Sequence, residues 1–294
     1  MKLNKTKNMN SKNISKIVIT CLLLASIATH AQTADSIILK DIAWDKSSPA
    51  GQIELTIPSE NSKLAGFIYS ANGAQKHPTL LMLHGFPGNE RNLDLAQVVR
   101  AHGWNVIYFD YRGSWASQGQ FGFENCVQDV KNVVSFCKKY SDSLHIDTSN
   151  IALFGHSMGG FVCLKVLASL PDIRKGFALS TWDIYASAKD LKSSQLKMAA
   201  KMMGEYFVLN TSSEKLISSV LANLSFFNIQ NEAMALAGKK IIMLDEHNRN
   251  KQLAESLKTS NHNYFDYEVW QTDHPFSNKR ISLINKVLEF LNRE

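Results

Sequence analysis

The chain has 294 residues, of which 45% are hydrophobic and 20% are charged, and its formal net charge is +6. The hydrophobic fraction excludes an intrinsically disordered chain, and 15 glycines with 6 prolines exclude collagen-like or low-complexity sequence. Five of the 32 basic residues and no acidic residue lie within residues 1–31. The rest of the chain is nearly neutral, with 27 basic against 26 acidic side chains, so its charge does not indicate a nucleic-acid partner.

Residues 1–31 have the pattern of a secretory signal peptide. Lysines precede an apolar run at residues 17–28, and small residues occupy positions −3 and −1 if cleavage follows Ala31. The run is shorter than the roughly 20 residues that a membrane-spanning helix needs. We therefore expect an exported protein, periplasmic or secreted, with no stable membrane insertion after cleavage; an uncleaved anchor is the alternative.

Three cysteines remain beyond the predicted signal peptide. Cys126 and Cys137 are eleven residues apart on one predicted helix, which separates them by about 16 Å. This distance is too long for a disulfide. Cys163 lies on an apolar helix face, where a buried free thiol is the usual state. We predict no structural disulfide.

The predicted elements begin with strands at residues 37–45, 51–57 and 63–70. Short apolar runs then alternate with segments of helical periodicity. The predicted strands are 79–83, 105–109, 150–154, 176–180, 240–244 and 267–270, and the predicted helices are 90–102, 124–140, one beginning near residue 157, and 281–291. This order predicts an α/β fold with a mostly parallel sheet, helices on both faces and an antiparallel N-terminal portion. Residues 181–239 contain no predicted strand, so we expect a small helical cap there.

A nucleophile motif, Gly155-His-Ser157-Met-Gly159, joins a predicted strand to a predicted helix. A sharp strand-to-helix turn would hold Ser157 in a strained conformation, and the two glycines would let the chain pass closely on either side. The serine hydroxyl would then be exposed at the positive end of a helix. This spacing predicts Ser157 as a catalytic nucleophile.

A second loop, at residues 83–88, follows the first predicted parallel strand. Acyl transfer requires preorganised N–H groups aimed at the developing oxyanion. We expect the amide of Phe86 in this loop to supply one donor and the amide of Met158, directly after the nucleophile, to supply the other. Residues 110–113 follow the next strand and are expected to brace this loop.

Taken together, four motifs resemble the α/β-hydrolase superfamily. They are His-Gly-Phe-Pro-Gly at residues 84–88, Asp-Tyr-Arg-Gly-Ser-Trp at 110–115, Gly-His-Ser-Met-Gly at 155–159 and Thr-Asp-His at 272–274. The chain is similar to the serine esterase, lipase and S9-like peptidase branches over roughly residues 60–294. The resemblance implies one hydrolase domain over residues 32–294, with the cap at about 181–239. It also implies the order serine, acid, histidine, which makes His274 the general base for Ser157.

The identity of the acid is less clear from the sequence. The resemblance expects an aspartate a few residues after the strand at 240–244, but the corresponding position holds an amide, Asn248. If the loop is contracted, Asp245 or Glu246 takes the role, and Asp183, after the preceding strand, is a further candidate. We select Asp245 and leave open Asp183, Glu246 and the absence of a working acid. The choice bears on activity, because an amide in place of a triad carboxylate costs about 10⁴ in turnover.

The sequence therefore predicts an exported serine hydrolase that cleaves carboxylic esters through an acyl-enzyme on Ser157. The alternatives are an S9-like peptidase or acyl-aminoacyl hydrolase, and a non-catalytic hydrolase-fold protein that binds a hydrophobic ligand. The expected partner is a small ester or a short acyl or peptide substrate. Methionines and aromatic residues of the cap either line an acyl pocket or form the core of the cap. Metal-ligand spacing and a phosphate-binding glycine loop are both missing, so we expect no metal and no cofactor.

Overall fold

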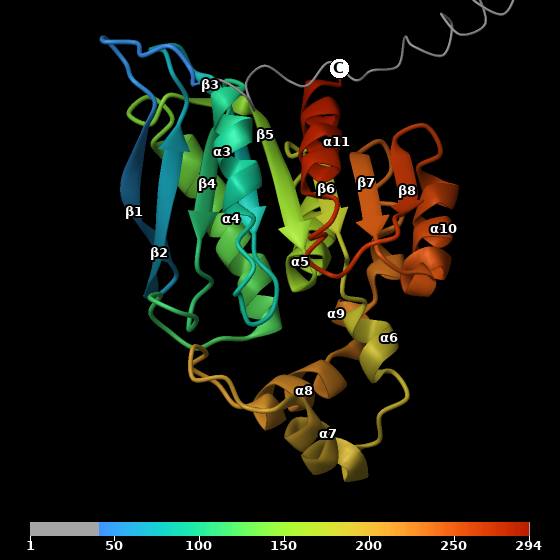
Figure 1. Cartoon of the computed structure of the whole chain (residues 1–294). Coiled ribbons are helices and arrows are strands. Elements are labelled where there is room, and N and C mark those ends of the chain that lie inside the picture. The colour runs from blue at the N-terminus through green and yellow to red at the C-terminus, as the bar shows by residue number, and fades with distance from the viewer. Residues whose placement is uncertain (1–40, 294) are drawn as a thin grey trace, which may run out of the picture. The chain divides into compact units, whose positions relative to one another are not determined.

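The computed structural model of the chain describes residues 41–293 (Figure 1). The predicted signal peptide and its cleavage point after Ala31 lie outside these residues. Within them, none of the helices combines the length and the apolar character that crossing a membrane requires.

The core of the fold is an eight-stranded sheet with the order β1-β2-β4-β3-β5-β6-β7-β8. The strands are β1 (Gly51–Ser59), β2 (Ser62–Ser70), β3 (His77–Leu83), β4 (Asn105–Phe109), β5 (Ile146–His156), β6 (Lys175–Leu179), β7 (Lys240–Asp245) and β8 (Phe265–Val269). β1 pairs with β2 and β2 with β4 in antiparallel fashion, whereas all other neighbours are parallel. The predicted mostly parallel sheet with an antiparallel N-terminal portion is confirmed.

The elements differ from the predictions in two places that matter later. Residues 41–45 form no strand, so that part of the predicted strand at 37–45 is wrong, and residues 37–40 lie outside the described part. Strand β7 extends one residue beyond the prediction and ends at Asp245 instead of Leu244.

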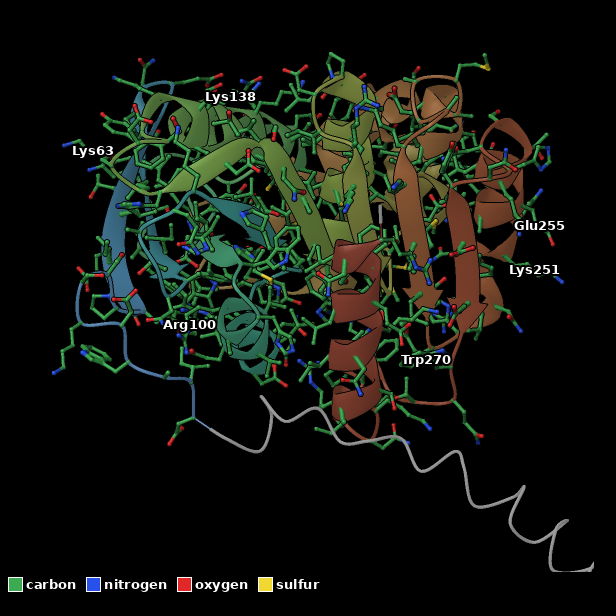
Figure 2. All side chains as sticks on the ribbon, turned by 90° about the horizontal axis from the view of Figure 1, so that it is seen from above. Lys63, Arg100, Lys138, Lys251, Glu255 and Trp270 are labelled. Carbon is green, nitrogen blue, oxygen red and sulfur yellow. The ribbon has the colours of Figure 1, made fainter. Side chains whose placement is uncertain are left out.

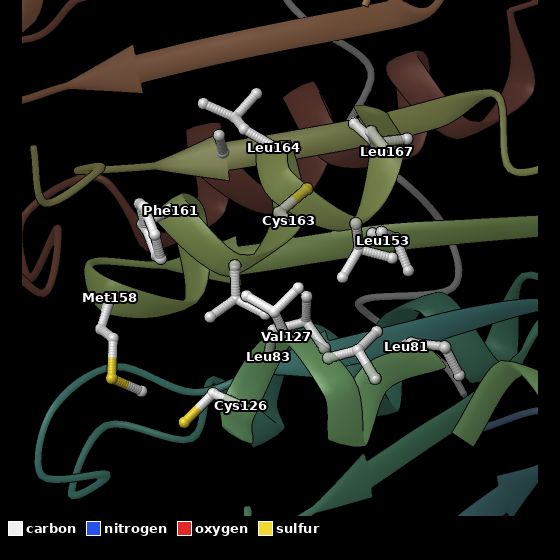
Figure 3. Packing of buried hydrophobic residues seen from close by; sticks show 14 of the residues in the cluster. Leu81, Leu83, Cys126, Val127, Leu153, Met158, Phe161, Cys163, Leu164 and Leu167 are labelled. Atoms are coloured by element: carbon white, nitrogen blue, oxygen red, sulfur yellow. The ribbon is translucent and has the colours of Figure 1, made fainter. Parts of the chain in front are cut away.

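Helices cover both faces of the sheet (Figure 1). α3 (Leu93–Ala101) and α11 (Arg280–Asn292) pack on one face, and α4 (Phe123–Lys139) and α5 (Met158–Ser169) pack on the other. α5 is apolar on almost its whole circumference because it lies between the sheet, α4 and the cap, which leaves no face to water. Figure 3 shows this layer, with Val127 of α4 among buried leucines of the sheet.

An additional helix that the sequence analysis did not predict, α10 (Lys251–Ser260), follows β7. Its buried side consists of only Leu253, Ala254 and Leu257, which is too few apolar positions for a clear periodic signal. On the outer side Lys251 and Glu255 point to solvent (Figure 2), with Nζ and Oε1 3.8 Å apart.

The interval between β6 and β7 consists of short helices. They are α6 (Ile184–Ala188), a 3-10 turn at Ser193–Gln195, α7 (Leu196–Met203), α8 (Ser213–Ala222), α9 (Leu224–Phe227) and a 3-10 turn at Ile229–Glu232. We refer to this interval as the cap; α7 and α8 lie beyond the edge of the sheet toward which the parallel strands point (Figure 1). Backbone hydrogen bonds from Trp115 N to Val208 O (2.8 Å) and from Asn210 N to Gly113 O (2.7 Å) join it to the loop after β4.

That loop is itself held by a buried ion pair. The Arg112 side chain is 7% exposed and lies 2.7 Å from the carboxylate of Asp129 on α4, which is fully buried. Arg112 also donates to Ser59 Oγ (3.0 Å) and pairs with Glu60, in the turn between β1 and β2. Because one arginine ties α4 and the β1–β2 turn to the loop after β4, its role is structural.

All three cysteines among residues 41–293 are free and buried. Cys126 and Cys163 lie within the core layer that Figure 3 shows. Burial raises the pKa of each of the three thiols, which keeps them protonated at neutral pH.

Candidate active site

The carboxyl ends of three neighbouring parallel strands define the candidate site. The register places His156 at the end of β5 opposite Leu179 of β6, and Leu179 opposite Leu244 of β7. The first residue beyond β5, Ser157, donates its N–H to Leu179 O, and the first residue beyond β6, Ser180, donates to Leu244 O, both at 2.8 Å. The chain segments that leave these strands are therefore side by side.

Ser157 occupies the strained turn that the sequence predicts. Its backbone angles, φ 59° and ψ −116°, lie where non-glycine residues cost about 1–3 kcal/mol. A Cβ on Gly155 would lie 2.0 Å from Gly159 O, and a Cβ on Gly159 would lie 2.0 Å from Leu83 O. Both glycines are thus required sterically, because the strand, the helix and the neighbouring β3 approach one another too closely for any side chain.

The two predicted oxyanion donors flank this serine. A Cβ on Gly85 would lie 3.1 Å from Ser157 Cβ, so the loop after β3 passes directly over the serine, and Phe86 is its next residue. Met158 is the first residue of α5, whose N–H has no acceptor within the helix. Its side chain is buried in the core (Figure 3), so only its backbone is available to the site.

The segment after β4 holds this loop in place. Trp115 Nε1 donates to Pro87 O (3.0 Å), and the guanidinium of Arg91 lies 4.9 Å from the Trp115 ring centroid. Arg91 also lies 3.8 Å from the carboxylate of Asp110. The direct contact with this loop thus comes from Trp115, two residues beyond the segment 110–113 that the sequence analysis expects to brace it, whereas Asp110 contributes through Arg91.

The carboxylate next to His274 is Glu246. Glu246 Oε1 lies 2.7 Å from His274 Nδ1, and Glu246 Oε2 accepts a hydrogen bond from Ser180 Oγ. Burial by itself raises the pKa of Glu246, but the hydrogen bonds from His274 and Ser180 outweigh it and lower the pKa to about 2. Glu246 is therefore ionised at neutral pH, and the selection of Asp245 as the partner of His274 is wrong.

Asp245 fails as this partner because it is the last residue of β7 and not the first residue of the loop. Successive side chains of a strand point to opposite faces, so residues 245 and 246 leave the chain in different directions. The Asp245 side chain is fully buried, and its Oδ2 accepts from Asn250 Nδ2 (3.0 Å), which also donates to Thr181 O. Oδ1 has no hydrogen-bond partner, and burial raises the pKa of Asp245 to about 7.

The third candidate acid, Asp183, has a local role. Its Oδ1 accepts from Ala186 N at 2.8 Å, which makes it the N-cap of α6. It lines the same pocket as His274, but the carboxylate on His274 Nδ1 is that of Glu246.

Two residues that the sequence analysis did not select support His274. His156 Nε2 lies 3.1 Å from His274 O, and the two imidazole rings are 4.7 Å apart. Burial lowers the pKa of His156 to about 4, so it is neutral and donates this hydrogen bond. Ser180 orients Glu246 from the other side. Nothing in the sequence marks Ser180, a serine at a strand end, as a partner of Glu246. The position of His156 directly before Ser157 is a signal that could have marked His156 as part of the site.

A pocket of about 720 Å³, lined mainly by polar residues, contains Ser157, Glu246 and His274. Its lining residues are Ser157, Ser180, Thr181, Trp182, Asp183, Ala186, Ser187, Glu246, His247, Arg249, Asn250 and His274. Ser157 and His274 form no direct hydrogen bond in this structure; catalytic hydrogen bonds commonly tighten only when substrate binds. No group of three or more His, Cys, Asp or Glu side chains within residues 41–293 is placed to hold a metal ion.

A second cavity of about 480 Å³ lies under the cap and is mostly apolar. Its lining residues are Phe86, Phe123, Trp182, Ile184, Ser187, Ala188, Leu191, Ala199, Met202, Met203, Tyr206, Ile217 and Val220. Trp182 and Ser187 line both spaces, and Phe86 brings the loop beside Ser157 into the cavity wall. A group bound at Ser157 therefore has a polar space on one side and an apolar space on the other.

The chain is similar to known proteins in sequence. A family model described as serine aminopeptidase, S33, matches residues 74–262. The chain is 24% identical to cutinase est2 of Thermobifida alba over 46% of this chain and 45% of the cutinase. It is 26% identical to the uncharacterised protein YfhR of Escherichia coli K12, over 55% and 59% of the two chains. These matches span about half the length of either relative.

Solved structures show the same fold. The esterase Pf2001 of Pyrococcus furiosus superposes with a TM-score of 0.61 at 20% identity, covering 83% of this chain and 93% of the esterase. Est1E of Butyrivibrio proteoclasticus superposes with a TM-score of 0.60 at 16% identity, covering 81% and 97%.

The buried Asp245 generates a prediction about stability and pH. Its pKa is about 7 in the folded protein against an ordinary 3.8, so the folded state binds this proton more tightly than the unfolded state. The protein therefore loses stability as the pH rises from about 4 to about 7. Asp245→Asn removes this ionisation, and we expect the variant to gain at least about 1 kcal/mol relative to wild type between pH 5 and pH 8. Urea unfolding of both proteins at pH 5 and at pH 8 measures the difference in unfolding free energy between variant and wild type. The same difference at the two pH values would contradict the raised pKa.

Proposed function

Because the chain belongs to the serine aminopeptidase S33 family of the α/β-hydrolase superfamily, we propose that it is a serine hydrolase that cleaves carboxylic esters through an acyl-enzyme on Ser157. The observation that carries the proposal is the Glu246–His274 hydrogen bond in the pocket that also exposes Ser157 at its strained turn. An imidazole that accepts the proton of a serine hydroxyl makes that hydroxyl nucleophilic at neutral pH, and an ionised carboxylate orients and stabilises the imidazole.

In the first half-reaction, Ser157 Oγ attacks the ester carbonyl carbon while His274 Nε2 accepts the hydroxyl proton. Glu246 keeps the other proton on Nδ1 and stabilises the imidazolium that forms. The amides of Phe86 and Met158 donate to the oxyanion, and one such donor contributes about 3–4 kcal/mol to the transition state. His274 then protonates the leaving alkoxide, which departs as the alcohol.

In the second half-reaction a water molecule replaces the alcohol. The oxygen of this water attacks the acyl carbon while His274 accepts one of the water's protons. The tetrahedral intermediate collapses, Ser157 leaves with the proton from His274, and the carboxylic acid is released. The hydrogen bond from His156 to His274 O keeps the imidazole beside Ser157 during both steps.

The first test compares the two adjacent carboxyl residues. We expect Ser157→Ala to abolish labelling by a fluorophosphonate probe, and Glu246→Gln to lower kcat for p-nitrophenyl acetate by about 10³–10⁴, because the amide does not stabilise the imidazolium. Asp245→Asn is the matched control, since it makes the same chemical change one residue away and should keep kcat within about threefold of wild type.

Circular dichroism on all three variants verifies that they are folded. Labelling of Ser157→Ala would overturn the nucleophile assignment. A larger loss in Asp245→Asn than in Glu246→Gln would overturn the assignment of the acid.

The apolar cavity supports an ester with a hydrophobic acyl group. Four aromatic side chains belong to its lining, with Phe86 packed against Phe123, Trp182 and Tyr206 at centroid distances of 4.9–6.0 Å. Two observations favour a second candidate, cleavage of an aminoacyl bond. The family model is described as an aminopeptidase, and Asp183 lines the polar pocket, where its carboxylate is available to a substrate ammonium group.

Substrate pairs distinguish these candidates. For an ester hydrolase, Ala199→Phe narrows the cavity and should lower kcat/KM for p-nitrophenyl octanoate by more than tenfold while changing that for the acetate by less than about threefold. For an aminopeptidase, alanine p-nitroanilide is the better substrate, and Asp183→Asn selectively raises its KM. Hydrolysis of the anilide but of neither ester would contradict the ester proposal.

We further propose that the protein is exported after cleavage between Ala31 and Gln32. The support is the charged, apolar and small-residue pattern of residues 1–31. Expressed with its natural N-terminus in a Gram-negative host, the protein should appear outside the cytoplasm with Gln32 as its first residue by mass spectrometry. Retention of Met1 in the exported fraction would favour an uncleaved anchor, and purely cytoplasmic protein would contradict export.

A further inference from the structure

Helix α7 of the cap presents apolar and basic side chains to solvent on one side. Met198 is 65% exposed and Met202 is 82% exposed, and their i, i+4 spacing places them on the same face. Lys197 and Lys201 have the same spacing beside them and are exposed as well. Phe207, in the segment that follows α7, is completely exposed. We call these five residues the cap patch.

The charge around the cap patch is predominantly positive. Lys189 and Lys192, in the segment that leads to α7, are also exposed. Neither these two lysines nor the two lysines of the cap patch form an ion pair with another residue of the described chain. Between residues 189 and 205 the only acidic side chains are Asp190 and Glu205, and both carboxylate oxygens of Glu205 face Ser213 N.

One residue of the cap patch, Met202, also belongs to the lining of the apolar cavity. Met202 is mostly exposed to solvent and at the same time lines the cavity, and Ala199 and Met203 of the same helix line it from within. Helix α7 therefore carries both patch residues and lining residues of the cavity, and the cavity shares Trp182 with the pocket that contains Ser157.

We propose that the cap patch docks onto the surface of an anionic lipid layer, from which an acyl ester enters the cavity beside α7. The role of the docked ester as substrate rests on the function proposed above, whereas the docking itself does not. Transfer of methionine and phenylalanine side chains from water into the apolar layer is favourable, and methionine adapts to irregular surroundings. Lysines at its border extend their ammonium groups to the lipid headgroups, and each such lysine strengthens binding to an anionic surface about fivefold.

The experiment reads out the environment of the cap patch directly. In the full-length chain with Cys21→Ala, a single cysteine introduced by Met198→Cys is labelled with a polarity-sensitive fluorophore; Cys126, Cys137 and Cys163 are buried and do not react. The matched control is Lys46→Cys, an exposed site directly after Asp45, whose N–H donates to Asn72 Oδ1 in the segment that leads into β3, at the amino ends of the parallel strands. Vesicles of phosphatidylglycerol with phosphatidylcholine are compared with vesicles of phosphatidylcholine alone.

We expect a blue shift at position 198 with the anionic vesicles, none at position 46, and little with the neutral vesicles. Adding Lys197→Glu and Lys201→Glu should weaken the binding that this shift reports at least tenfold. A shift of equal size at position 46, an equal shift with neutral vesicles, or no shift at position 198 overturns the proposal.

A second measurement separates docking from catalysis. The shift should persist with Ser157→Ala, so a failure of the catalytic proposal leaves it intact. With Ser157 present, Lys197→Glu/Lys201→Glu should lower hydrolysis of an ester embedded in anionic vesicles at least tenfold and leave soluble p-nitrophenyl acetate unaffected. An equal loss on both substrates would show damage to the active site and overturn the docking role of the lysines.

Discussion

The site depends on the parallel register of β5, β6 and β7. Because Leu179 lies opposite both His156 and Leu244, β5 and β6 end at the same level and β7 ends one residue farther on, at Asp245. Ser157, Ser180 and Glu246 are then neighbours, although up to about 90 residues separate them in the chain. A shift of one residue in any of these strands would reverse the direction of the side chains that follow.

The same constraint gives two adjacent carboxyl groups opposite properties. Asp245 is within β7 and buried, which favours its neutral form, whereas Glu246 is beyond the strand and held by Ser180 and His274, which favours its charged form. Glutamate also has one methylene more than aspartate, which extends its reach to His274. A neutral and an ionised carboxyl group can occupy consecutive positions because like-charge repulsion between them is avoided.

Much of this arrangement was predictable from local pattern. Strand and helix periodicity indicates the α/β fold, and the glycines around Ser157 indicate the strained turn, because both signals arise from neighbours in the chain. The acid was not predictable in this way, since a one-residue extension of β7 decides between Asp245 and Glu246 and depends on pairing with β8. The support of His274 by His156 and the continuity of cap patch and cavity likewise depend on contacts between distant residues.

Glu246 accepts the hydrogen bond that keeps the Nδ1 proton on His274. Proton NMR at low field detects an imidazole N–H that is protected by a hydrogen bond to a carboxylate, and His274→Ala assigns the resonance. We expect this resonance in wild type and in Asp245→Asn, and we expect it to be absent in Glu246→Gln. Retention in Glu246→Gln together with loss in Asp245→Asn would contradict this pairing of Glu246 with His274.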